Sequence, residues 1–295
     1  MGAYELMKQL NALRSRIIFQ EYFPLIAYGI AFLLTILGVQ KDVKTGISMT
    51  FFFFVIATVA VAVICSGRNK LKRRFVELYK ESFVTTVVSS FLEGTTYRDY
   101  RGFSQMDVAT FGLVKVGNVF NSEDLICGSY KGVDFRQADA TILNVTEVDG
   151  EKHIEQYFSG RLFEFTYPGK YVQNVKVFSH NFKISLNLDA PIIDLESVDF
   201  NNAFDVYTIE PVDAFYILTP QVMERLVKLQ RRYNNIGFRF GDKRVCVAID
   251  GINSFEPDYR KKISYLEEKE RLKGEFNVIT EMIELLGLIP EDDKE

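Results

Sequence analysis

Two long apolar segments near the start of the chain dominate its pattern of hydrophobic and polar positions. No charged residue interrupts residues 22–40, a run of 19, or residues 45–67, a run of 23. A helix of 19 residues reaches about 28 Å, close to the thickness of a bilayer's hydrocarbon core. Only residues 41–44 separate the segments, so the sequence predicts a transmembrane helical hairpin over residues 22–67. Two buried helices of a soluble core are the alternative. A cleaved signal peptide fits poorly, because the first run starts late and a second follows at once.

Basic residues flank the hairpin unevenly. Lys8, Arg14 and Arg16 precede the first segment, and the link carries only Lys41 and Lys44. The second segment is followed by a basic cluster made of Arg68, Lys70, Lys72, Arg73 and Arg74. The positive-inside rule therefore predicts an inner-membrane protein of two spans with both termini in the cytoplasm. The basic cluster either only fixes this topology or also contacts anionic lipid headgroups.

The segments on either side of the hairpin show helical periodicity. Residues 1–21 place Leu6, Leu10, Leu13 and Ile17 on one helix face. This helix could lie in the membrane interface, pack on the helix that leaves the second span, or extend the first span into the cytosol. Residues 68–94 predict a juxtamembrane helix that ends at Gly94.

Residues 95–295 predict one cytoplasmic α+β domain. We expect a loop over 95–110, a short strand over 111–116, and turns at Lys131-Gly132, Asp149-Gly150 and Pro168-Gly169. Further β-prone runs cover residues 124–130, 133–145, 153–167, 174–179, 192–197, 205–209, 236–240 and 244–249. Their spacing and tight turns predict an antiparallel meander rather than βαβ units.

Two helices complete the predicted domain. Thr219-Pro220 has the residues of a helix cap and first turn. A long charged amphipathic helix is predicted from about Asp258 to Leu288, with Gly274 as a candidate break. Its apolar face could pack on the sheet or on another copy of the chain.

The distribution of charge excludes one class of partner. Residues 1–74 carry ten Lys/Arg and three Asp/Glu, a balance of +7, which leaves residues 75–295 with 25 basic and 36 acidic residues, a balance of −11. An acidic body does not suit a protein that holds a phosphate backbone, so we expect no nucleic-acid partner. The three cysteines, Cys65, Cys127 and Cys246, fit no zinc pattern and are expected to be reduced.

No motif for catalysis or for a cofactor stands out. The two histidines, His153 and His180, lack metal-ligand spacing, and phosphate loops and nucleophile elbows are absent from the sequence. A Ser–His–Asp or Cys–His unit stays open, because such units form in space rather than in sequence. Glu196 and Asp199, near Asp205, are a candidate polar cluster, with a solvated acidic surface as the alternative. We therefore predict no catalytic, cofactor or metal site.

One stretch of the chain has a specific family signature. Residues 192–207 read IIDLESVDFNNAFDVY and residues 213–226 read DAFYILTPQVMERL. Residues 121–128 (NSEDLICG) and 158–163 (FSGRLF) add to it. These segments resemble the bacterial membrane-protein family known as domain of unknown function 3137. The resemblance implies two N-terminal spans, a C-terminal domain and genes often found near those of LemA-type membrane proteins, but no activity and no site residue.

These observations predict a membrane-anchored cytoplasmic module without enzymatic activity. It would bind the lipid bilayer and a protein partner, or assemble with itself. A sensor of a small ligand or lipid, with a pocket between sheet and helices, is the first alternative. A membrane-proximal enzyme of unknown chemistry is the second.

Overall fold

The computed structural model describes residues 2–39, 43–92, 94–166, 174–252 and 255–290. The chain divides into two compact units. The first contains residues 1–83 and 256–270, and the second contains residues 84–255 and 271–295. The predicted link residues Lys41 and Asp42 and the predicted turn at Pro168-Gly169 lie outside the described residues.

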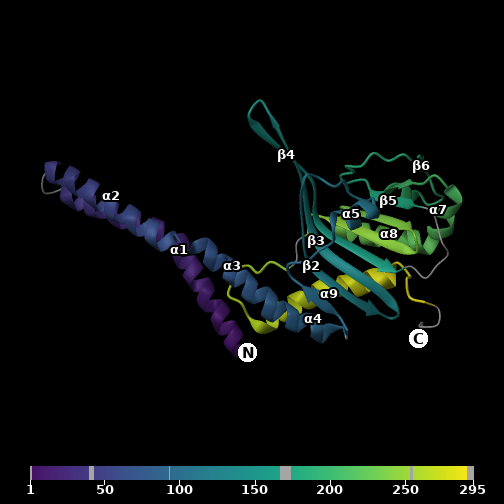
Figure 1. Cartoon of the computed structure of the whole chain (residues 1–295), viewed down its shortest axis with the longest axis horizontal. Coiled ribbons are helices and arrows are strands. Elements are labelled where there is room, and N and C mark those ends of the chain that lie inside the picture. The colour runs from purple at the N-terminus through teal and green to yellow at the C-terminus, as the bar shows by residue number, and fades with distance from the viewer. Residues whose placement is uncertain (1, 40–42, 93, 167–173, 253–254, 291–295) are drawn as a thin grey trace. The chain divides into compact units, whose positions relative to one another are not determined.

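The first unit is built mainly from α1 (Ala3–Val39), α2 (Val43–Cys65) and α3 (Arg68–Leu78), with α1 packed on α2 and α3 (Figure 1). The amphipathic face of α1 is used in this packing, because Leu6, Leu10 and Ile17 are buried. Since α1 is continuous, residues 3–20 extend the first apolar segment, and they also contact the helix that leaves the second one. Two of the three predicted placements of the N-terminal segment therefore hold together: it extends the first apolar helix, and it packs on the helix that follows the second.

An extended segment of the C-terminal region completes the first unit. Asn11 fixes it, donating from Nδ2 to the Ile263 carbonyl at 2.9 Å and accepting from the Ile263 N–H at 3.1 Å. These bonds hold the backbone before residue 265 out of helical geometry. The predicted helix start at Asp258 is therefore wrong: α9 covers Tyr265–Leu285. Gly274 lies inside α9, so the candidate break is also wrong.

The helix predicted over residues 68–94 has a π-helical interruption. After α3, the π-helix η1 (Tyr79–Val84) leads into α4 (Thr85–Phe91). Gly94 follows with a φ of 78°, a left-handed conformation that glycine adopts without strain. The predicted helix end at Gly94 is confirmed to within a few residues.

The second unit contains an antiparallel sheet of nine strands in the order β1-β2-β3-β4-β9-β8-β5-β7-β6. The strands are β1 (Thr96–Arg98), β2 (Val119–Tyr130), β3 (Val133–Val148), β4 (Glu151–Thr166), β5 (Val175–Ser179), β6 (Ile192–Ile193), β7 (Phe204–Tyr207), β8 (Ile236–Gly241) and β9 (Arg244–Asp250). The predicted α+β class and antiparallel sheet are confirmed. The meander covers only β1 to β4, because β9 and β8 insert between β4 and β5.

Residues 95–116 differ from the prediction. The expected loop contains β1 and part of α5 (Gln105–Phe111), and the expected strand at 111–116 is absent. Ser104 and Asp107 form a capping box at the start of α5, and Gly112 ends the helix with a φ of 58°. The apolar run at 111–116 is buried core at a helix end, which periodicity over six residues cannot distinguish from a strand.

The strands β3 and β4 form a long hairpin whose outer part projects from the sheet (Figure 1). Its turn is the predicted Asp149-Gly150, with φ values of 54° and 79°. Pairing with β2 begins at Leu143, and pairing with β9 begins at Gly160. Residues 144–155 therefore extend beyond both neighbouring strands.

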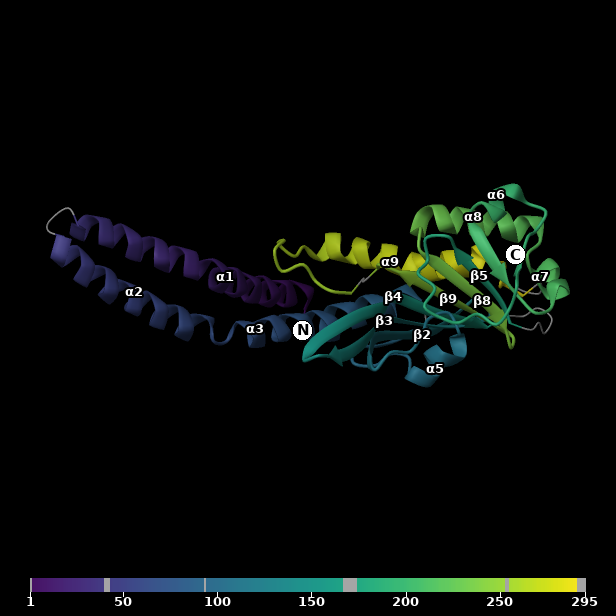
Figure 2. The ribbon, with the colours of Figure 1, turned by 90° about the horizontal axis from the view of Figure 1, so that it is seen from above.

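Helices cover both faces of the sheet (Figure 2). On one face, α5 packs over a core that includes Ala138, Ile142 and Leu162. The other face is covered by α8 (Pro220–Tyr233) and the 271–285 part of α9. Two short helices, α6 (Val198–Asn201) and α7 (Pro211–Ile217), lie at the β6–β7 end of the sheet.

Candidate functional site

A large hollow of the second unit lies between α8 and the segment around α6, which are neighbours in space (Figure 2). Local sequence fixes both walls. Thr219 accepts a hydrogen bond from the Val222 N–H at 3.5 Å, and Pro220 starts α8, as predicted. Ser197 accepts from the Phe200 N–H at 3.3 Å and so begins α6. The predicted strand at 192–197 is correspondingly limited to β6.

This hollow is a groove with two connected parts, and we call it the α8 groove. One part has a volume of about 480 Å³ and includes Met223 and Glu196, and the other has about 430 Å³ and includes His180. Both parts are lined by Asp199, Val227 and Arg231. The groove is open to solvent and follows α8 from Pro220 to Arg231, which is about 16 Å at 1.5 Å per residue.

The charges of the α8 groove are distributed between its two walls. Glu196 and Asp199 stand on the α6 wall and make no ion pair with any described residue. On the α8 wall, Lys228 bonds Glu224 at 2.8 Å. This hydrogen bond, together with the charge of Lys228, lowers the pKa of Glu224. Arg231 makes no ion pair within the described chain. Opposite charges therefore face one cavity without contacting each other.

The predicted polar cluster of Glu196, Asp199 and Asp205 is only partly assembled. Glu196 and Asp199 share the α8 groove, whereas Asp205 lies 3.4 Å from His180 Nε2 through its Oδ1. His180 reaches the far part of the groove. The other histidine, His153, is exposed on the projecting hairpin. The two histidines therefore lie on different parts of the surface and do not form one site.

The cysteines occupy three unrelated environments. Cys65 ends α2, and Cys127 lies half-buried in β2. Burial, with a smaller contribution from the charge of Glu164, raises the pKa of Cys246 in β9 to about 12. A thiol with this pKa stays protonated at neutral pH, so Cys246 is a core residue rather than a nucleophile.

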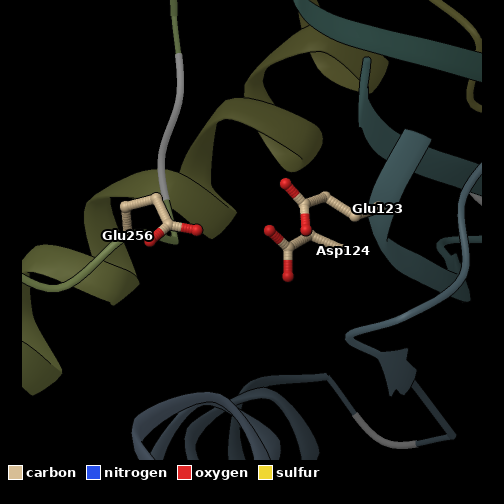
Figure 3. A group of neighbouring side chains, drawn as sticks. All are labelled: Glu123, Asp124 and Glu256. Atoms are coloured by element: carbon tan, nitrogen blue, oxygen red, sulfur yellow. The ribbon is translucent and has the colours of Figure 1, made fainter. Parts of the chain in front are cut away.

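Two carboxylates stand side by side at the bulge in β2. Asp124 has a φ of 61°, which turns its side chain to the side of Glu123, and their oxygens approach within 4.8 Å (Figure 3). Asp124 also accepts a 2.5 Å hydrogen bond from Tyr97. Burial, reinforced by the charge of Asp124, raises the pKa of Tyr97. Figure 3 also labels Glu256, which belongs to the first unit and pairs there with Lys80 at 2.9 Å.

A buried arginine that the sequence analysis did not single out lies under α9. Arg161 on β4 is fully buried and donates to Asp139 at 3.1 Å and to Glu275 at 3.2 Å. Its guanidinium lies 5.3 Å from the ring centre of Phe255. The signal in the sequence was an arginine inside the apolar run of β4, in the FSGRLF segment. Both of its partners belong to the second unit, so this arrangement holds α9 on the sheet.

The basic cluster occupies the first two turns of α3. Lys72 donates to the Tyr259 hydroxyl at 2.9 Å, and its Nζ lies 4.5 Å from the centre of that ring. Lys70, Arg73 and Arg74 are exposed, and Arg68 is half-buried. A contact of these residues with lipid headgroups stays a prediction.

The surface of α1 and α2 is apolar where it is exposed. Leu25 is 71% exposed, Phe51 75% and Val63 67%. In length and composition, α1 and the helical stretch that begins with α2 are each sufficient to cross a membrane. The alternative of two helices in a soluble core requires these side chains to be buried, and they are not.

Comparisons with known proteins give one family match and one similar solved structure. Residues 156–288 match the family model described as "Protein of unknown function (DUF3137)", which confirms the resemblance carried by the signature. No curated protein matches the chain. Among solved structures, the mycobacterial trehalose monomycolate transport factor A, TtfA, is similar with 10% identity and a TM-score of 0.38. That match covers 74% of this chain and 96% of that chain.

Proposed function

We propose that this chain, which carries the DUF3137 family domain, is a membrane-anchored module that binds a protein partner at the cytoplasmic face of the inner membrane. Its α1 and α2 cross the bilayer as a hairpin, and no catalytic role is assigned to the second unit. The exposed apolar surface of α1 and α2 is the observation that carries the proposal.

The free energy of transfer favours lipid by a wide margin. Among the described residues from 22 to 63, fifteen large apolar side chains are exposed, at fractions from 42% to 75%. Burying an exposed side chain of this size contributes about 1.5–3 kcal/mol. Allowing for partial exposure, moving these side chains from water into lipid is worth on the order of 20 kcal/mol. A free monomer in water would keep these side chains exposed and would lack this stabilisation.

Polar groups within the two helices support the hairpin arrangement. Gln20 donates from Nε2 to the Ile64 carbonyl at 2.6 Å, and the Tyr28 hydroxyl donates to Thr58 at 3.5 Å. These bonds join α1 to α2. Inside a bilayer, polar side chains need such partners because water is absent.

The orientation rests on the basic residues. Eight of them, Lys8, Arg14, Arg16 and the five of the basic cluster, lie outside the hairpin, and two lie in its link. The positive-inside rule favours cytoplasmic termini, which brings the second unit to the cytoplasmic side. Anchoring also concentrates the module near other membrane proteins.

Membrane extraction tests the anchor. The full chain should stay in the membrane pellet after an alkaline carbonate wash, and protease added outside intact spheroplasts should leave residues 75–295 uncut. A double variant, Phe32→Arg with Phe51→Arg, should lower the fraction of chain in the pellet, because each charge inside a span costs up to about 2.5–3.5 kcal/mol of the transfer free energy. The matched control, Met106→Arg at an exposed position of α5, should stay in the pellet. Wild type in the supernatant, or external cleavage of the second unit, would overturn the proposal.

The size of the α8 groove favours a second candidate, a sensor of a small ligand. A volume of about 480 Å³ lies within the range of small-molecule sites. The groove differs from the predicted pocket between sheet and helices, since it lies between α8 and α6 on the outer side of the unit. Thermal stabilisation of the full chain by amino acids or lipid headgroup analogues, abolished by Val227→Trp, would support this candidate over the first.

A further inference from the structure

The α8 groove has features of a peptide site. It runs about 16 Å along α8, open to solvent on one side, and Met223 and Val227 give it an apolar floor. A small-molecule site encloses most of its ligand. A groove that is open and elongated suits a chain segment, whose two ends continue into the rest of a partner.

The charge pattern of the walls specifies the segment. Glu196 and Asp199 on the α6 wall lack an ion-pair partner among the described residues, and so does Arg231 opposite them. Arg231 is not within ion-pair distance of either carboxylate, although all three side chains line the groove. A guest that presents a cation to the α6 wall and an anion to the α8 wall would satisfy both sides at once.

We propose that the α8 groove binds a partner segment in which one apolar side chain is flanked by a basic and an acidic residue. The apolar side chain lies on Met223 and Val227. The basic residue pairs with Glu196 and Asp199, and the acidic residue pairs with Arg231. This inference rests on the proposed function, because it names the surface and the kind of partner for the interaction module.

Selection from a displayed library of random dodecapeptides tests the proposal, with the full chain in lipid nanodiscs as bait. Enriched peptides should carry an apolar residue between opposite charges. A synthetic copy of an enriched peptide should bind wild type, and its affinity should fall at least about tenfold in Arg231→Glu, because the interacting charge is reversed. Arg101→Glu, an equal charge change at an exposed position outside the groove, should bind like wild type.

A second variant tests the apolar floor of the α8 groove separately from its charged residues. Val227→Trp fills the groove and should abolish binding, while Arg231→Glu changes only an exposed residue and keeps the fold. Failure to enrich any peptide, or equal binding by wild type and Arg231→Glu, would refute the proposal. Selective binding of single amino acids in place of peptides would also refute it.

The two proposals fail in different experiments. If crosslinking in native membranes attaches a partner elsewhere on the second unit and the library yields nothing, the groove assignment is wrong and the interaction function stands. If peptides bind the groove but the chain leaves the membrane on carbonate washing, the anchor is wrong and the groove assignment stands.

Discussion

Replacing Arg161 by methionine should destabilise the second unit strongly. The guanidinium is fully buried and bonds Asp139 and Glu275, whose side chains are 9% and 29% exposed. Methionine fills much of the same volume, but it removes the ion pair that Arg161 makes with the nearly buried carboxylate of Asp139. A buried charge that loses its partner costs far more than the pair itself contributed.

The expected loss of unfolding free energy is about 3–5 kcal/mol, the usual cost of removing one member of a buried ion pair. For a domain of this size, each kcal/mol lowers the melting temperature by roughly 2–4 °C. The variant should therefore melt about 6–20 °C below wild type. Because Glu275 is partly exposed, most of this loss comes from Asp139, and Arg161→Met combined with Asp139→Leu should recover a large part of it.

A second arginine that pairs with α9 provides the matched control. Arg232 on α8 contacts Glu281, but about half of the arginine side chain is exposed. Solvent screens this pair, so Arg232→Met should cost less than about 1 kcal/mol. Thermal unfolding of the full chain in nanodiscs, followed by near-ultraviolet circular dichroism, compares the two variants. Equal melting temperatures for Arg161→Met and Arg232→Met would show that the buried network does not stabilise the fold.

Three other changes give independent expectations. Ser104→Ala removes the capping box of α5 and should cost about 1 kcal/mol, measured by hydrogen exchange of residues 105–111. Gly160→Ala should cost about 1–3 kcal/mol in thermal unfolding, since its Cβ would lie 2.1 Å from the Ile249 carbonyl oxygen. Burial raises the pKa of Cys246 from 9.0 to about 12. As pH rises, the unfolded chain therefore loses the thiol proton before the folded chain does. The free energy of unfolding should fall between pH of about 9 and 12. In the same alkaline range, Cys246→Val should show a shallower fall, and an unchanged slope would contradict the assignment.

Local features of this fold can be predicted from sequence because their causes are local. The Asp149-Gly150 turn needs positive φ at two positions, and few other residue pairs adopt it as easily. Thr219-Pro220 supplies both a side-chain acceptor and a fixed φ at the start of α8. The apolar helices α1 and α2 follow from composition alone. In each case the physical reason lies within a few neighbouring residues.

Non-local features could not be predicted in the same way. The insertion of β9 and β8 beside β4 depends on pairing between residues about 80 positions apart, such as Phe165 with Val245. The start of α9 depends on Asn11, more than 250 positions earlier, which bonds the backbone at Ile263. The missed helix α5 is a different case, because its Ser104 and Asp107 capping box was present in the sequence. The apolar run at residues 111–116 suggests a strand by its β-prone composition. Ser104 and Asp107 just before it are the stronger signal, because they have the spacing of a helix capping box.

One wall of the α8 groove can be predicted from the sequence, and the other cannot. Glu196 and Asp199 could be recognised as a pair because they are close in sequence, but Arg231, their counterpart across the cavity, is about 30 residues away on another element. Alone, two carboxylates on an acidic surface indicate only solvation. Opposed to an unpaired arginine across an apolar floor, they define a site with a preferred partner. The information needed for this conclusion is the packing of α6 against α8, which arises only when the sheet brings β7 and β8 onto the two sides of β5.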